Sequence, residues 1–388
     1  MNVEIRVILS AAVRCGASDV HLKVGAPPML RIHGDLIPVE GAEKVDRETM
    51  QAYLAQLMAD HHRERLARSF QVDFAYGEPS LGRFRVNVFY QRGEPAAALR
   101  LIPVVIRSSE ELRLPPVVER IAQERRGLVL VTGTTGSGKS TTLAALVRSI
   151  NESRACHIIT VEDPIEYVHE DAESIISQRE IGVDATSFAD ALKAALRQDP
   201  DVILVGEMRD LETIETAMLA AETGHLVMST LHTLDAPETI TRVISAFPEH
   251  QRDQARLILA SVLKGIISQR LVPRGDGKGV VPAIEVMVST ALIRECIAIK
   301  ERTREIREAI ARGYKTYGMQ TFDQSLMQLW RQGLITYDEA VAESSNAADF
   351  ALEARGVSST SDSRWSEFNS GVEDSESEAE AAVKVERF

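Results

Sequence analysis

The segment GTTGSGKS, residues 133–140, combines residue types and spacing that bind phosphate. It matches G-x-x-x-x-G-K-[S/T] at every fixed position, between the strand-like run LVLVT and the helical pattern STTLAALVRSI. Glycines let backbone N–H groups approach phosphates closely, and a helix N-terminus favours negative charge. We therefore predict a nucleoside triphosphate site in which Lys139 reaches the β- and γ-phosphates and the Ser140 hydroxyl binds Mg²⁺. The predicted nucleotide-binding residues are Gly133, Thr134, Thr135, Gly136, Ser137, Gly138, Lys139, Ser140 and Thr141.

A second apolar run, DVILVGE at residues 201–207, ends in the carboxylate of Glu207. A P-loop site needs an acidic group at the carboxyl end of a neighbouring strand, where it works with Mg²⁺. The Asp-Glu pair that is common at this place is Gly206-Glu207 here, so one carboxylate serves. The sequence has no N-K-x-D segment for reading guanine and no recognisable second-substrate pocket or lid, which disfavours a GTPase and a P-loop kinase.

More carboxylates follow the run HIITVE, in the segment IITVEDPIEYVHE at residues 158–170. If this strand ends beside the P-loop, its carboxylates project into the same crevice, where they could activate or orient water. A plain solvated loop is the alternative from these residues alone. A dedicated metal cage is disfavoured, because Mg²⁺ at nucleotide sites is held by one or two protein ligands plus phosphates.

The elements that must position these residues belong to the second of two predicted domains. In residues 124–345, strand-like apolar runs alternate with helical patterns, which predicts βαβ units and a parallel sheet. From about residue 257 to 340 the pattern is mainly helical. Residues 1–110 indicate a smaller mixed domain of strands and helices, and the proline pair in RLPPVVER places a linker at 111–123.

The last part of the chain, residues 346–388, is predicted to be an acidic, Ser-rich disordered tail. Residues 358–388 contain no Leu or Ile. Such a segment buries too little apolar surface to offset the entropy lost on ordering.

Composition restricts the class of protein and its partners. The 388 residues carry a formal net charge of −13, which argues against a sequence-independent grip on nucleic acid. Three distant cysteines without a C-x-x-C indicate neither a zinc ribbon nor a disulfide framework. No apolar run approaches the roughly 18 residues of a membrane helix, and a signal-peptide layout is missing. We therefore predict a cytoplasmic protein without membrane insertion, whose contact with a membrane is peripheral; the family resemblance described below implies that this membrane is the inner membrane.

Four segments in order resemble the Walker A, Asp, Walker B and His boxes of type II/IV secretion ATPases: GTTGSGKST, ITVEDPIEYVH, ALRQDPDVILVGEMRD and TGHLVMSTLHTLDA. The chain resembles in particular the pilus retraction ATPases of the PilT/PilU type, over roughly residues 1–345. The resemblance implies an α/β protein that binds ATP and Mg²⁺ and assembles as a homohexamer. A PAS-like N-terminal α+β domain would precede a RecA-like P-loop ATPase domain with a helical C-terminal part.

The resemblance also implies a role for each remaining candidate in the second domain. Glu166, in the Asp box, would be the general base, with Glu162 as the nearby rival. Glu207 would work with Mg²⁺ and water, and His232 would sense the γ-phosphate.

Two arginines of the first domain, Arg85 and Arg100, match arginines that reach the nucleotide across domains or subunits in this family. Solvated strand arginines are the alternative. The chain departs from the family in two places. Leu234 replaces the Asn of the usual HTNDA, and ALIRECIAIKE at residues 291–301 only partly matches the retraction signature AIRNLIRE.

The function that the resemblance implies is a hexameric ATPase motor that powers type IV pilus retraction, and thereby twitching motility. Force would pass through an inner-membrane platform protein. One alternative is an accessory paralogue that modulates a sister motor, with or without its own turnover. A pilus assembly or type II secretion ATPase is disfavoured, because these usually carry a larger N-terminal extension and a tetracysteine loop that this sequence lacks.

Overall fold

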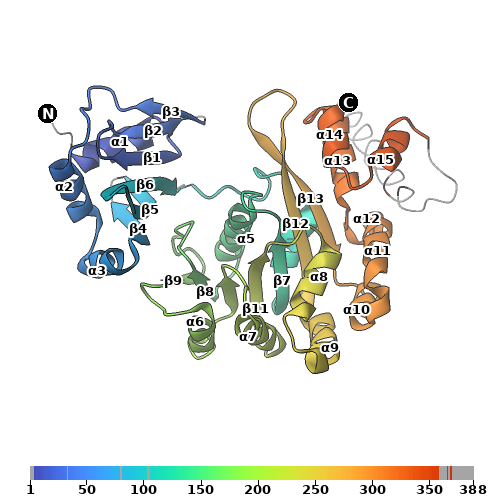
Figure 1. Ribbon diagram of the computed structural model, residues 1–388. Coiled ribbons are helices and arrows are strands. Elements are labelled where there is room, and N and C mark those ends of the chain that lie inside the picture. Colours follow the sequence, from blue (N-terminus) through green and yellow to red (C-terminus); the bar gives the residue numbers. More distant parts are fainter. Residues whose placement is uncertain are drawn as a thin grey trace, which may run out of the picture. The chain divides into compact units, whose positions relative to one another are not determined.

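The computed structural model of the protein describes residues 4–32, 34–78, 81–102, 105–357, 365 and 368. The chain divides into two compact units (Figure 1). The first comprises Met1–Val105 with Pro164–Val168, and the second comprises Ile106–Asp163 with His169–Phe388. The division after Val105 lies close to the predicted domain end at residue 110.

The first unit is a six-stranded antiparallel sheet in the order β3-β2-β1-β6-β5-β4. Phe84, Val86 and Val88 alternate with polar residues along β5 and are fully buried, so one face of the sheet carries the core. Three helices supply the other side of this core through residues such as Ile8 and Met50. The elements are α1 (Ile5–Arg14), β1 (Asp19–Lys23), β2 (Met29–Ile32), β3 (Asp35–Pro38), α2 (Arg47–Leu57), α3 (Asp60–Ser69), β4 (Gln71–Glu78), β5 (Gly82–Gln91) and β6 (Glu94–Ile102).

The second unit contains a seven-stranded sheet in the order β13-β12-β7-β11-β10-β8-β9. Neighbouring strands from β12 to β9 pair in parallel, as the alternation of strands and helices predicts, and β13 is antiparallel to β12. The strands are β7 (Gly127–Thr132), β8 (His157–Glu162), β9 (Ile175–Glu180), β10 (Val202–Val205), β11 (Leu226–Leu231), β12 (Leu263–Pro273) and β13 (Val280–Val288).

Helices cover both faces of this sheet, which explains why its central strands are continuously apolar. Along β7, Leu128 and Leu130 face one core cluster, whereas Val129 and Val131 face the other. No helix within the described ranges has the length and apolar composition needed to cross a membrane. The helices are α4 (Pro116–Ala122), α5 (Lys139–Ser153), α6 (Phe188–Ala195), α7 (Leu211–Glu222), α8 (Ala236–Ser245), α9 (Arg252–Val262), α10 (Ala291–Ala298), α11 (Ile306–Arg312), α12 (Tyr314–Tyr317), α13 (Phe322–Arg331), α14 (Tyr337–Glu343) and α15 (Ala347–Ala354), with short 3₁₀ turns η1 (Glu249–Gln251) and η2 (Lys300–Glu305).

The strands β12 and β13 correct the prediction of a mainly helical region from residue 257 to 340. They form a long antiparallel hairpin that extends the sheet beyond β7. Most of their residues are buried, so neither strand shows the alternation of a half-buried strand. A strand without this alternation cannot be distinguished from a buried helix by periodicity.

The predicted linker at 111–123 is also partly wrong, because it contains the helix α4. The second proline of the pair is the first helical residue, where the missing N–H costs nothing and the fixed φ angle suits a helix. Val118 and Ile121 are buried against the sheet, so the helix belongs to the second unit.

The predicted disorder from residue 346 is wrong where the structure describes this part of the chain. Asn346 caps α15 by accepting hydrogen bonds from the backbone N–H groups of the second and third following residues. Trp365 and Phe368 are buried in a cluster with Phe322 and Phe350. Aromatic side chains bury a large area each, so these two residues contribute to the core although Leu and Ile are absent from this part of the sequence. The rest of the predicted tail lies outside the described residues.

Candidate active site

The carboxyl ends of four adjacent parallel strands carry the main predicted site residues. The P-loop follows β7, His232 follows β11, Glu207 follows β10 and Glu162 ends β8. Since the strands lie in the order β7-β11-β10-β8, these groups form a row along one edge of the sheet. Ligands of open parallel sheets bind at this edge.

Two glycines shape the P-loop. Gly133 has a φ angle of 145°, and a Cβ atom there would lie 2.4 Å from the carbonyl oxygen of Gln269. Any other residue at position 133 would therefore clash with β12. Gly138 is the N-cap of α5 with a φ angle of 90° and offers no capping side chain, so the first turn of α5 presents backbone N–H groups to an anion.

The polar groups inside the loop fit a phosphate. Lys139 is only 8% exposed, and its Nζ donates to the carbonyl oxygens of Gly133 and Thr134, at 2.9 Å each. A buried ammonium is costly without an anion, and carbonyl groups compensate it only in part. The Ser137 hydroxyl is buried and has no hydrogen-bond partner among the described residues. A phosphate oxygen would satisfy both groups.

The predicted Mg²⁺ ligands supply hard oxygen donors, which this cation prefers. Ser140 is the second residue of α5, and Glu207 is the second residue after β10, with its side chain 15% exposed. In the described ranges, no group of three or more His, Cys, Asp or Glu residues could hold a metal by itself. The donor set therefore fits Mg²⁺ bound mainly through nucleotide phosphates, with one hydroxyl and one carboxylate from the protein.

Two side chains lie beside Glu207. Arg209 Nε lies 2.6 Å from Glu207 Oε1, and His232 Nε2 lies 3.7 Å from Glu207 Oε2. The contact with Arg209 restricts the orientation of the carboxylate, whereas the His232 ring lies close to it without a hydrogen bond. The sequence analysis missed Arg209, whose signal was only a charged residue two places after Glu207 in GEMRD.

Glu162 is fixed by its own hydrogen bonds. Its Oε1 accepts from Thr160 Oγ1 at 2.7 Å and from Gln178 Nε2 at 3.3 Å. A Cβ atom at Gly206 would lie 3.3 Å from the carbonyl oxygen of Val161 and 3.4 Å from the Cα atom of Glu162. A side chain at position 206 would therefore be tightly packed against the end of β8.

Three predicted site residues, Arg85, Arg100 and Glu166, belong to the first unit. Arg85 on β5 lies directly opposite Arg100 on β6. Arg100 Nε forms an ion pair with Asp19 Oδ1 at 3.0 Å. Partial burial opposes ionisation of Asp19, but hydrogen bonds from Ser18 and Arg100 lower the pKa of this carboxyl. The roles of the two arginines and of Glu166 at the nucleotide stay predictions.

Comparison with known proteins identifies the family. A family model described as "Type II/IV secretion system protein" matches residues 2–312. The chain is 43% identical over 338 residues to the "Type IV pilus retractation ATPase PilT" of Pseudomonas aeruginosa, covering 87% of this chain and 97% of that protein. It is 41% identical over 350 residues to the "Type IV pilus ATPase PilU" of the same organism, covering 90% of this chain and 91% of that protein.

A solved structure with a similar fold is the crystal structure of the pilus retraction motor PilT with bound ADP. The TM-score is 0.83 at 47% sequence identity, and the match covers 90% of this chain and 99% of that chain. This match confirms the predicted fold class. The family model spans both units, from residue 2 to residue 312. The chain therefore belongs to the type II/IV secretion system protein family.

Proposed function

We propose that the chain is an ATP hydrolase that powers type IV pilus retraction, and thereby pilus disassembly and twitching motility. The observation that carries the proposal is the row of P-loop, His232, Glu207 and Glu162 on four neighbouring strands. It occurs in a chain that is 43% identical to a protein named as the pilus retraction ATPase PilT.

The geometry supports a separate role for each residue of the site. Lys139 exchanges its carbonyl partners for β- and γ-phosphate oxygens, while the first turn of α5 donates backbone hydrogen bonds. Ser140 and Glu207 would hold Mg²⁺, which would supply positive charge beside the phosphates when bound. Arg209 keeps the Glu207 carboxylate oriented. His232, whose side chain is 49% exposed, remains available to contact the γ-phosphate.

The general base is proposed to be Glu166 rather than Glu162. Two hydrogen bonds hold the Glu162 carboxylate at the end of β8, which suits a positioning role. We expect Glu166→Gln to lower kcat by about 10²–10⁴ with little change in ATP affinity, because a base acts in the transition state. Steady-state turnover and binding of an ATP analogue to both single Gln variants test this. A larger kcat loss in Glu162→Gln would transfer the role to Glu162.

The proposed assembly is a homohexamer at the cytoplasmic face of the inner membrane that passes force to a pilus platform protein. Support comes from the similarity to the pilus retraction motor PilT over 90% of the chain. A second candidate function is that of an accessory retraction ATPase that works with a paralogous motor. The observation in its favour is the 41% identity to PilU, close to the 43% identity to PilT.

Deletion of the gene in its own organism tests the proposed function. For a retraction motor we expect more surface pili and loss of twitching motility, both restored by the wild-type gene. Loss of pili would instead indicate an assembly motor. Unchanged motility, together with a purified protein that hydrolyses no ATP, would reject the main proposal and favour the accessory function.

A further inference from the structure

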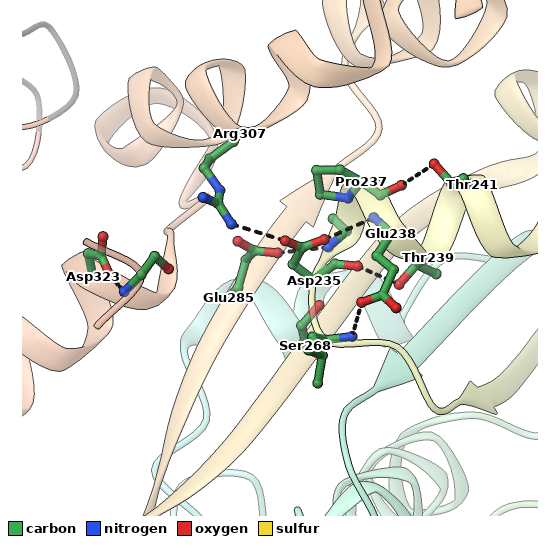
Figure 2. Close-up of polar contacts among 12 residues, drawn as sticks. Asp235, Pro237, Glu238, Thr239, Thr241, Ser268, Glu285, Arg307 and Asp323 are labelled. Atoms are coloured by element: carbon green, nitrogen blue, oxygen red, sulfur yellow. Dashed lines mark hydrogen bonds and ion pairs between the residues drawn. The ribbon is translucent and has the colours of Figure 1, made fainter. Parts of the chain in front are cut away.

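The turn between β11 and α8 carries His232. Two carboxylates, those of Asp235 and Glu238, stabilise this turn by accepting hydrogen bonds from backbone N–H groups. Asp235 is the N-cap of α8 and accepts a hydrogen bond from the backbone N–H of Glu238 at 2.9 Å. The side chain of Glu238 in turn accepts from the backbone N–H of Leu234 at 2.8 Å. His232 lies three residues before Asp235, so the contacts of Asp235 and Glu238 (Figure 2) constrain the backbone that carries it.

Two residues from distant elements bind this turn. Glu285 on β13 is 1% exposed, and its Oε1 accepts a hydrogen bond from the backbone N–H of Ala236 at 2.9 Å. Arg307 on α11 donates from Nη2 to Asp235 Oδ2 at 3.0 Å. Figure 2 shows the guanidinium of Arg307 lying toward the carboxylates of both Asp235 and Glu285.

Burial of the Glu285 carboxyl costs free energy in the folded protein. Burial raises the pKa of Glu285 to about 7, and the nearby charge of Asp235 acts in the same direction. The N–H of Ala236 and the charges of Arg307 and Arg270 oppose the rise. Replacing buried charged groups by apolar packing of the same volume is often neutral or stabilising, so stability alone does not explain Glu285. Its contacts therefore point to a role in positioning the turn.

The same hairpin also holds the P-loop strand. Glu285 pairs in register with Ser268 on β12, and Ser268 Oγ accepts a hydrogen bond from Thr132 Oγ1 at 3.0 Å. Thr132 is the last residue of β7, directly before the P-loop. The β12–β13 hairpin thus binds both the strand that leads into the P-loop and the turn that carries His232.

Glu285 and Arg307 also lie beside residues of the C-terminal helices. Glu285 and Arg307 line a cavity of about 470 Å³ together with Asp323 of α13 and Asp349 of α15. The ion pair of Arg307 with Asp235 links α11 directly to the N-terminus of α8. A shift of the turn would therefore be transmitted to α11 through this ion pair.

We propose that Glu285 and Arg307 are positioning residues that hold the turn after β11, so that His232 meets the γ-phosphate, and that they link γ-phosphate binding to the C-terminal helices through α11. The inference rests on the proposed role of His232. It assigns a task to a buried carboxylate and an arginine that take no direct part in ATP hydrolysis.

The test measures affinity for a non-hydrolysable ATP analogue and for ADP, and compares their ratio between variants of the full chain. His232→Ala is expected to reduce the preference for the triphosphate. Arg307→Ala is expected to reduce it by about fivefold or more, a usual size for coupling between sites, while ADP affinity stays unchanged. Arg307 is half-exposed, so this variant should fold. In the double variant, the loss should equal that of His232→Ala alone, because the arginine acts through the histidine.

Two further variants serve as controls. Arg304→Ala removes the same charge from an exposed position in the preceding 3₁₀ turn and should leave the ratio unchanged. Glu285→Gln keeps an acceptor for the N–H of Ala236 and should retain most of the preference, whereas Glu285→Ala should lose it.

The outcomes separate this inference from the proposed function. If His232→Ala lowers the preference and Arg307→Ala leaves it intact, the inference is overturned and the role of His232 stands. Losses that add in the double variant also overturn it, because the arginine then acts by another route. If His232→Ala itself has no effect on the ratio, both the role of His232 and this inference fail.

Discussion

Lys139→Ala is expected to abolish ATP turnover. The Lys139 ammonium is buried, and two carbonyl groups at 2.9 Å already aim it into the loop. A buried charge acts strongly on the phosphates because little water screens it, and removing a comparable donor from an active site costs about 10²–10³ in kcat. Steady-state phosphate release by the purified protein measures the loss.

A matched variant distinguishes this loss from a general effect of removing a lysine. Lys193 on α6 is half-exposed and forms an ion pair with Glu212 away from the loop. Lys193→Ala should keep turnover close to that of the wild type, because an exposed ion pair contributes little to stability. If Lys139→Ala retains more than about a tenth of wild-type turnover, the P-loop is not the hydrolytic site, because removing a donor from that position should lower kcat by more than about tenfold.

Arg85→Ala and Arg100→Ala are each expected to lower turnover by about 10³–10⁵, as removal of an arginine finger does in P-loop enzymes. The guanidinium is suited to this task because its charge is fixed and its planar fork grips two phosphate oxygens. Binding of an ATP analogue should persist, since the P-loop is intact. Turnover and analogue binding of both single variants check the prediction.

The register of the first sheet supplies a physical reason to expect that Arg85 and Arg100 bind phosphate. Arg85 and Arg100 lie directly opposite each other, and like charges in that position destabilise a sheet. Asp19 pairs with Arg100, whereas Arg85 has no hydrogen bond or ion pair with another described residue. An arrangement that costs stability in this way is suited to binding an anion.

A neighbouring arginine and a mixing experiment complete the design. Arg31 lies on the strand next to Asp19 and donates to the carbonyl oxygen of Gly34, so Arg31→Ala should leave turnover unchanged. If the arginine acts on a neighbouring subunit, mixing Arg100→Ala chains with Lys139→Ala chains should restore part of the activity. Silent variants that no mixture rescues would place the arginines at the site of their own chain. Normal turnover in both single variants would contradict the arginine hypothesis.

The parts of the fold that local sequence specifies could be predicted. The strand before the P-loop and the strands that lead to Glu162, Glu207 and His232 are short apolar runs buried on both faces, and the P-loop pattern is contiguous. The order of these strands in the sheet could not be predicted from their order in the chain. That order alone shows that the four groups form a row.

Features that depend on long-range pairing were missed. The β12–β13 hairpin is buried on both faces and shows no strand period, so its role in holding the P-loop strand was invisible. The opposition of Arg85 and Arg100 depends on the register of two strands. Arg209 gave no signal beyond its charge, because the contact with Glu207 depends on the conformation of the loop between them.

The buried aromatic residues near the end of the chain bear on how a shortened protein would behave in solution. Phe368 packs edge-on against Tyr314 at 5.0 Å and Trp365 at 5.5 Å, and the guanidinium of Arg331 lies 5.3 Å above its ring. A chain that stops at Gly356 would lose both aromatic anchors and expose the apolar surface beneath them. Exposed apolar surface of this kind promotes aggregation. For expression and crystallisation, a chain cut beyond Phe368 should therefore aggregate less than a chain that stops at Gly356.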